Sequence, residues 1–173
     1  MDGRPILSDQ WNQCLNGVQW DRPTTLFPTC ICWSEGMKSE PSSQGGMNVY
    51  PTRDGAYIQV KGVDFGAQGP GSFFASVAGQ PKDGLKGGAI ELRLDRIDGP
   101  LIGTLPVGDT GGEWKTEAIP VSGATGTREL FFVFRNSPHA SVFKFDHWKF
   151  DPKAAPPRAI SPTAAPNGIL NSQ

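Results

Sequence analysis

Short apolar runs alternate with polar turns through the middle of the chain. In the segment GAIELRL, single polar positions separate Ile90, Leu92 and Leu94, and this period of two is typical of a half-buried strand. We expect these three side chains to face the core and Glu91 and Arg93 to face water. Runs of this kind predict strands at residues 56–60, 72–78, 88–94, 101–107, 114–121, 129–134 and 142–150.

Turn-forming residues fill the gaps between these runs, and the longer windows have no helical period. The tripeptide at 98–100 (DGP) and the segment at 109–112 (DTGG) are typical of tight turns between strands. So many short strands within about 120 residues are typical of two packed sheets. We therefore predict an all-β fold, a β-sandwich of the jelly-roll type.

Composition divides the chain into three regions. Residues 1–26 are polar with scattered tryptophans, which predicts an irregular N-terminal arm or linker. Residues 151–173 are rich in Pro and Ala, a composition typical of an extended linker or tail without a core of its own. The β-sandwich is therefore expected at residues 27–150.

Charge narrows the class of partner. The 173 residues include 16 Lys and Arg against 17 Asp and Glu, so the net charge is −1. A nucleic-acid-binding domain usually carries a clear basic excess, and a membrane span needs about 18 consecutive apolar residues; the sequence has neither. We expect a monomer whose partner is neutral, either a sugar or another protein.

The three cysteines, Cys14, Cys30 and Cys32, leave the redox setting open. A Cys14–Cys30 or Cys14–Cys32 disulfide would suit a secreted protein, and free thiols would suit the cytoplasm equally well. Residues 1–7 lack the apolar stretch of a signal peptide. The expectation is either a piece of a longer exported protein or a cytoplasmic protein.

Side chains suited to catalysis are sparse. His139 and His147 stand in neither a serine-nucleophile motif nor a zinc-binding motif, so we expect no enzyme active site. Aromatic residues in loops and at strand ends, such as Trp33, Tyr50 and Trp114, suit a sugar site better. A flat aromatic ring packs against the C–H face of a pyranose, and polar neighbours bind its hydroxyl groups.

Ordered motifs between residues 29 and 150 resemble those of a known family. They are CWSEG (32–36), GGMNVY (45–50), DGAYIQVKGVDFG (54–66), GGAIELRLD (87–95), GPLIGT (99–104), TGG (110–112), GATGT (123–127) and FKFDHWKF (143–150). Together they resemble carbohydrate-binding module family 6, especially the modules of xylan- and arabinoxylan-degrading hydrolases such as glycoside hydrolase family 43. The resemblance implies a jelly roll, a non-catalytic role, binding of xylan or β-glucan, and an extracellular location with an attached or neighbouring hydrolase.

The resemblance also implies a sugar site in loops at one end of the sandwich. In the family a Tyr and a Trp clasp a sugar ring and an Asn binds it by hydrogen bonds. The nearest positions in this chain are Tyr50, Trp114 and Asn136. Lys144 stands where an Asn is common in the family.

A structural calcium ion is the cofactor that the resemblance implies. In the family, acidic residues of the first strand and an Asp of the last strand hold it, and Asp146 matches that Asp. The first-strand positions are Phe27, Pro28 and Thr29, which carry no carboxylate. Calcium prefers several charged oxygen ligands, so we expect most of the calcium affinity to be lost.

Two further interpretations stay open. A sandwich that has lost its sugar site would act as a structural or protein-interaction domain, marked by an exposed apolar patch. An unrecognised glycosidase would need two carboxylates about 5–10 Å apart in one groove. The leading prediction is the binding module.

Overall fold

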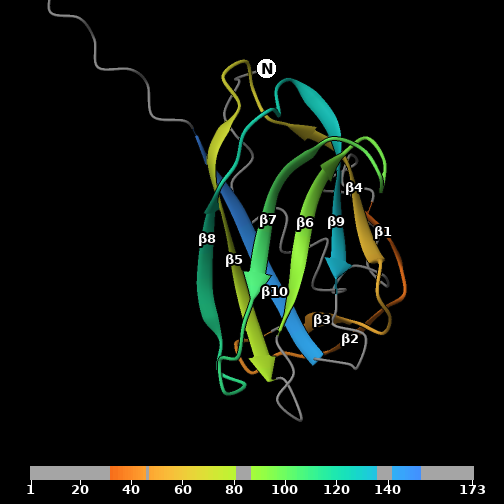
Figure 1. Ribbon diagram of the computed structural model, residues 1–173, viewed down its shortest axis with the longest axis vertical. Helices are drawn as coiled ribbons and strands as arrows, with labels where there is room; N and C mark the ends of the chain where they lie inside the picture. Colours follow the sequence, from red (N-terminus) through yellow and green to blue (C-terminus); the bar gives the residue numbers. More distant parts are fainter. Residues whose placement is uncertain (1–31, 46, 81–86, 136–141, 153–173) are drawn as a thin grey trace, which may run out of the picture.

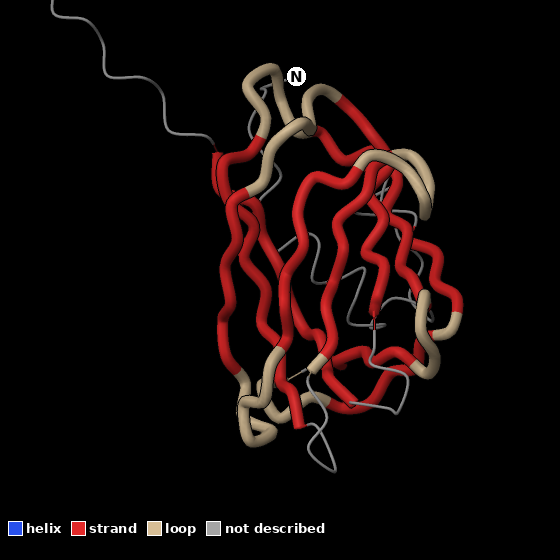
Figure 2. The backbone as a smooth tube through the Cα atoms, in the orientation of Figure 1, coloured by secondary structure: helices blue, strands red, loops and turns tan. Residues whose placement is uncertain are grey.

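The computed structural model describes residues 32–45, 47–80, 87–135 and 142–152, which form two antiparallel sheets packed face to face (Figure 1). Sheet A has the order β1-β4-β9-β6-β7, and sheet B has the order β2-β3-β10-β5-β8. The described residues contain strands and loops and no helix (Figure 2), in agreement with the predicted β-sandwich jelly roll. The strands are β1 (Cys32–Glu35), β2 (Met37–Pro41), β3 (Met47–Pro51), β4 (Ala56–Asp64), β5 (Pro70–Gln80), β6 (Gly88–Leu94), β7 (Leu101–Val107), β8 (Lys115–Pro120), β9 (Thr127–Arg135) and β10 (Val142–Pro152).

The strands predicted from alternation are present. Those at 88–94 and 101–107 match β6 and β7 at both ends, β8 is one residue shorter at each end, and the others extend further than predicted. Strands β1, β2 and β3 were missed because they are four or five residues long, too short for a clear period. The predicted N-terminal arm, the tail beyond residue 152, Cys14, Cys30 and His139 lie outside the described residues.

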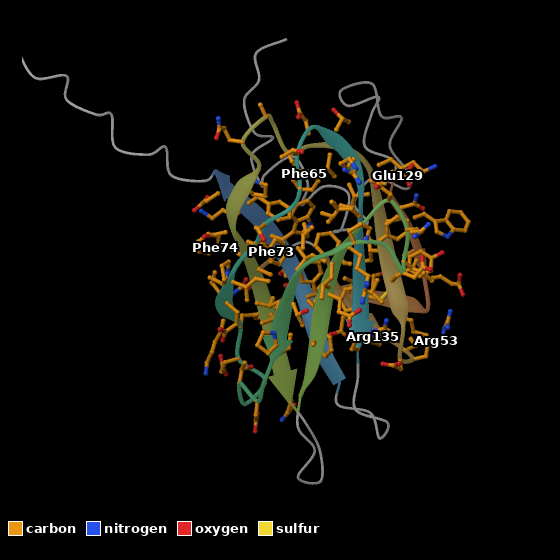
Figure 3. The ribbon with its side chains drawn as sticks, turned by 45° about the horizontal axis from the view of Figure 1, so that its top comes forward. Arg53, Phe65, Phe73, Phe74, Glu129 and Arg135 are labelled. Atoms are coloured by element: carbon orange, nitrogen blue, oxygen red, sulfur yellow. The ribbon has the colours of Figure 1, made fainter. Side chains whose placement is uncertain are left out.

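The core between the sheets is rich in aromatic rings. Phe132 of sheet A packs against Phe145 and Trp148 of sheet B, with ring centroids 5.4 Å and 4.9 Å apart. Phe73 lies between the sheets as well, 5.8 Å from the Phe132 ring (Figure 3). Burial of each such side chain contributes about 1.5–3 kcal/mol, so these rings hold the two sheets together.

The alternation in β6 is confirmed on its inner side and corrected on its outer side. Ile90, Leu92 and Leu94 are buried as predicted. Glu91 and Arg93 point away from the core, but each side chain is only about one-fifth exposed because the two pair with each other at 2.9 Å. The outer face of sheet A is therefore covered by paired charges rather than open to water at this point.

Strand β10, in the middle of sheet B, contains an irregularity. Its register against β5 shifts between Phe145 and Trp148, which marks a β-bulge. Strict alternation would send residues three apart to opposite faces, yet both of these side chains are fully buried. The bulge therefore adds one residue to the strand while both rings stay in the core.

Candidate functional site

The turn between β2 and β3, residues 42–45, folds over the outer face of sheet B. Ser42 Oγ donates a hydrogen bond to Asp146 Oδ2 at 2.6 Å, and Ser76 Oγ donates one to Gln44 Oε1 at 3.3 Å. Asp146 and Ser76 lie on β10 and β5 and are buried on a face that would otherwise meet water. These bonds anchor the turn across two neighbouring strands.

Trp114 lies just before β8, and its position is fixed by the 42–45 turn and by the loop that precedes it. Its indole Nε1 donates to Ser43 Oγ at 3.0 Å, so the 42–45 turn fixes the ring. The preceding loop is fixed by Thr110, whose N–H donates to the Gly79 carbonyl at 2.8 Å and whose Oγ accepts the Gly79 N–H at 3.0 Å. A Cβ at position 79 would lie 2.0 Å from the Gly108 carbonyl oxygen, so only glycine allows this close approach.

Tyr50 lies on β3 and faces outward. Its neighbour Val49 is buried and pairs with Phe145 of β10, so alternation turns Tyr50 to the outer face of sheet B. Tyr50 is half-buried there and pairs with Lys38 of β2. The next residue, Pro51, is buried.

One line of residues crosses the outer face of sheet B and contains both aromatic candidates. Lys144 pairs with Ala78, and the registers on either side, extended by one residue, place Tyr50 and Trp114 in the same line. We call Lys38, Tyr50, Lys144, Ala78 and Trp114 the cross-strand row. Tyr50 and Trp114 are three strand spacings apart, about 14 Å between their Cα atoms.

Charge in the middle of the cross-strand row comes from an ion pair. Lys144 Nζ pairs with Glu40 Oε1 of β2, and both side chains stay partly exposed. Lys144 lies between the two aromatic residues and Glu40 lies on β2, beyond Tyr50, so the ammonium and the carboxylate supply hydrogen-bond donors and acceptors beside the row. Asn136, the third predicted sugar contact, lies outside the described residues.

The predicted calcium ligand Asp146 has few suitable neighbours. It is 3% exposed, its Oδ2 accepts the Ser42 hydroxyl, and its Oδ1 lies 3.8 Å from His147 Nδ1. In the part of the chain that the structure describes, no group of three His, Cys, Asp or Glu side chains is placed to hold a metal. Calcium takes six to eight oxygen ligands, so the described donors alone do not fit it. Residues 27–29 lie outside the described ranges.

The outer face of sheet A has a second group of aromatic side chains, which the sequence analysis did not single out as a group. Trp33 on β1 is 61% exposed. Tyr57 on β4 packs against Phe131 of β9 at 5.9 Å between centroids, and its hydroxyl donates to Glu35 at 3.4 Å. Gln59 of β4 pairs with Trp33 across the two strands, and extending the alternation of AYIQV to its outer side would have placed Gln59 on the same face as Tyr57.

Paired charges surround these rings. Arg53 pairs with Glu35, and Arg135 reaches Glu91 at 3.2 Å (Figure 3 labels both arginines). Burial alone would raise the pKa of Glu91, but hydrogen bonds and charge from Arg93 and Arg135 outweigh it and hold the pKa below its ordinary value. Glu91 is therefore an ionised structural partner rather than a proton donor near neutral pH.

The family model of carbohydrate-binding module family 6 matches residues 30–152. The chain belongs to this family. The match covers all ten strands, and none of the described residues forms a helix that could cross a membrane.

Relatives and solved structures agree with this assignment. An arabinoxylan arabinofuranohydrolase of Bacillus subtilis is 41% identical over 127 residues, which are 69% of this chain and 24% of the relative. A counterpart from Paenibacillus polymyxa is 36% identical over 75% of this chain and 21% of its own length. The chain thus spans less than a quarter of the length of these curated relatives.

A family 6 module from Clostridium cellulolyticum, solved with xylose, has a TM-score of 0.60 and 36% identity to this chain. The similarity covers 68% of this chain and 88% of that module. The chain therefore matches most of a binding module of the family, but less than a quarter of the larger enzyme.

Proposed function

We propose that this chain is a non-catalytic module that binds β-linked plant-cell-wall polysaccharide, xylan or β-glucan, and targets an attached glycoside hydrolase to it. The main support for the position of the binding site is that Tyr50 and Trp114 lie in one cross-strand row. A sugar chain lying along this row could stack on both rings, because about 14 Å between the Cα atoms of the two residues leaves room for more than one pyranose. Lys144 between the two aromatic residues, and Glu40 beside Tyr50, would bind its hydroxyl groups.

The relatives favour the same function. Similar structures include the family 6 module solved with xylose and a β-1,3-glucan-binding module from Bacillus halodurans at 27% identity. Attachment to a hydrolase, and with it an extracellular location, is proposed because the curated relatives are much longer enzymes. Tethering keeps the enzyme concentrated at its substrate, so modest affinity of the module would be enough.

Affinity electrophoresis through gels containing xylan, β-glucan, arabinan or cellulose tests the proposal. We expect retardation by xylan or β-glucan, and Tyr50→Ala and Trp114→Ala each to weaken binding about tenfold or more, since each removes a stacking surface. Trp33→Ala is the matched control, because it removes an exposed indole from the other sheet. Each variant's fold is checked by circular dichroism.

The outcomes separate the alternatives. Loss of retardation in Trp33→Ala alone would move the site to sheet A. Retardation by none of the four polymers would favour a sandwich that has become a protein-interaction domain. Running each gel with a calcium chelator adds the metal test: unchanged retardation and melting temperature are expected, and a fall in either would restore calcium at Asp146.

A further inference from the structure

Most lysines and arginines of the described residues pair with a carboxylate. Arg53, Arg93, Arg96, Arg128, Arg135, Lys144 and Lys149 all do so. Lys38, Lys61 and Lys115 have no such partner within the described ranges. Two of these three lysines stand beside the aromatic residues of the cross-strand row: Lys38 opposite Tyr50, and Lys115 directly after Trp114.

The two ends of the cross-strand row differ in net charge. At the Trp114 end, Glu113 precedes the ring and offsets the charge of Lys115. At the Tyr50 end, Glu40 is paired with Lys144. Asp146 is buried, with one oxygen accepting the Ser42 hydroxyl, and forms no ion pair with Lys38. Among the described residues, Lys38 is therefore an exposed cation without a paired carboxylate, beside a half-buried tyrosine.

This juxtaposition fits a particular kind of sugar. Directly paired residues of antiparallel strands have Cβ atoms about 4.5–5.5 Å apart, so Lys38 reaches a substituent of a ring stacked on Tyr50. A neutral sugar would use the ammonium only as a hydrogen-bond donor. A uronic acid presents both a pyranose face and a carboxylate, which match the ring and the cation together.

We infer that the Tyr50 end of the row selects polysaccharide carrying uronic acid units, with Lys38 as the residue that determines this selectivity. The inference rests on the proposed carbohydrate-binding function and adds the chemical class of the recognised unit. An exposed ion pair strengthens binding about two- to fivefold, and salt screens it. The preference is therefore modest and dependent on ionic strength.

The test compares one polymer before and after removal of its charge. Glucuronoxylan is used as isolated and after chemical reduction of its carboxyl groups to alcohols, which leaves the backbone unchanged. At low salt we expect the chain to bind the native polymer about two- to fivefold more tightly than the reduced one, with the difference lost near 0.5 M salt. Affinity electrophoresis at several polymer concentrations measures both dissociation constants.

Substitutions test whether Lys38 produces the preference for the charged polymer. Lys38→Ala should abolish the difference between the polymers and Lys38→Glu should invert it, while both variants still bind reduced xylan. Lys61→Ala is the matched control, an exposed unpaired lysine on sheet A, and should retain the full preference.

Equal affinity for the two polymers, or a preference that survives Lys38→Ala, would overturn the inference and leave the proposed function intact. Binding to neither polymer, with no retardation by β-glucan either, would overturn the proposed function and this inference with it.

Discussion

The outer faces of the two sheets both carry polar and aromatic side chains, but they use charge differently. On sheet A, Glu91 joins Arg93 and Arg135 in a network within the sheet. On sheet B, the buried carboxylate of Asp146 is met by a hydroxyl from the turn at 42–45, and Lys38 is exposed beside Tyr50. Most charges on the outer face of sheet A are paired within the sheet, although Lys61 is not, whereas on sheet B an unpaired lysine stands directly opposite a tyrosine, in the row where we propose that the ligand binds.

The largest expected effect tests the turn on sheet B. Ser42→Ala removes the hydroxyl that donates a hydrogen bond to Asp146. The buried carboxylate of Asp146 then lacks this hydrogen bond. Hydrogen bonds to charged groups contribute about 1.5–3 kcal/mol, so we expect the free energy of unfolding in urea to fall by about 2 kcal/mol. Adding Asp146→Asn should recover part of the loss by removing the buried charge. A loss below about 0.5 kcal/mol would contradict the anchoring role of this bond.

Disrupting the ion pairs of Glu91 on sheet A should have a smaller effect on the free energy of unfolding, and this effect should depend on pH. The pKa of Glu91 is held below its ordinary value, so folding favours the ionised carboxylate. Its contribution is present at neutral pH and is lost as pH falls below the ordinary value of 4.5 toward the lowered one. Glu91→Gln should cost about 1 kcal/mol at pH 7 and unfold with a weaker dependence on pH in this acid range. An identical loss for the variant at pH 3 and pH 7 would argue against the network.

The smallest effect is expected at the exposed edge of sheet A. Trp33 is 61% exposed, so Trp33→Ala should change the free energy of unfolding by less than about 0.5 kcal/mol. Thermal unfolding followed by circular dichroism measures this change. A loss above about 1 kcal/mol would mean that Trp33 packs against more of the molecule than the described residues provide.

How well the sequence predicts a structural feature depends on how far apart in the chain the residues that produce it lie. Alternation is local, and it placed the ends of β6 and β7 and the inward residues of β6 without error. The pair between Glu91 and Arg93 is local, but the second partner of Glu91 was not predictable, because Arg135 comes from β9, 44 residues away.

The candidate site shows the same limit. The resemblance pointed to Tyr50 and Trp114 as parts of one sugar site, but nothing in the local sequence indicates that they share a cross-strand row. Ser43 contacts Trp114 across 71 positions of sequence, because the turn at 42–45 crosses the sheet. A contact of this kind depends on strand order. In sheet B, β3 lies between β2, its neighbour in sequence, and β10, which comes from the far end of the domain.

The bulge in β10 has a consequence for how this strand tolerates changes in length. An extra residue in a regular strand would exchange its two faces from that point on and turn Lys149 toward the core. Here the irregularity lies between Phe145 and Trp148, so the surplus residue is accommodated and the alternation resumes in its original phase. His147 can be regarded as an insertion that the fold has absorbed, and a chain without it would form a plain strand with the same rings inward. We therefore expect this central strand to tolerate the loss of one residue at this point with its faces unchanged.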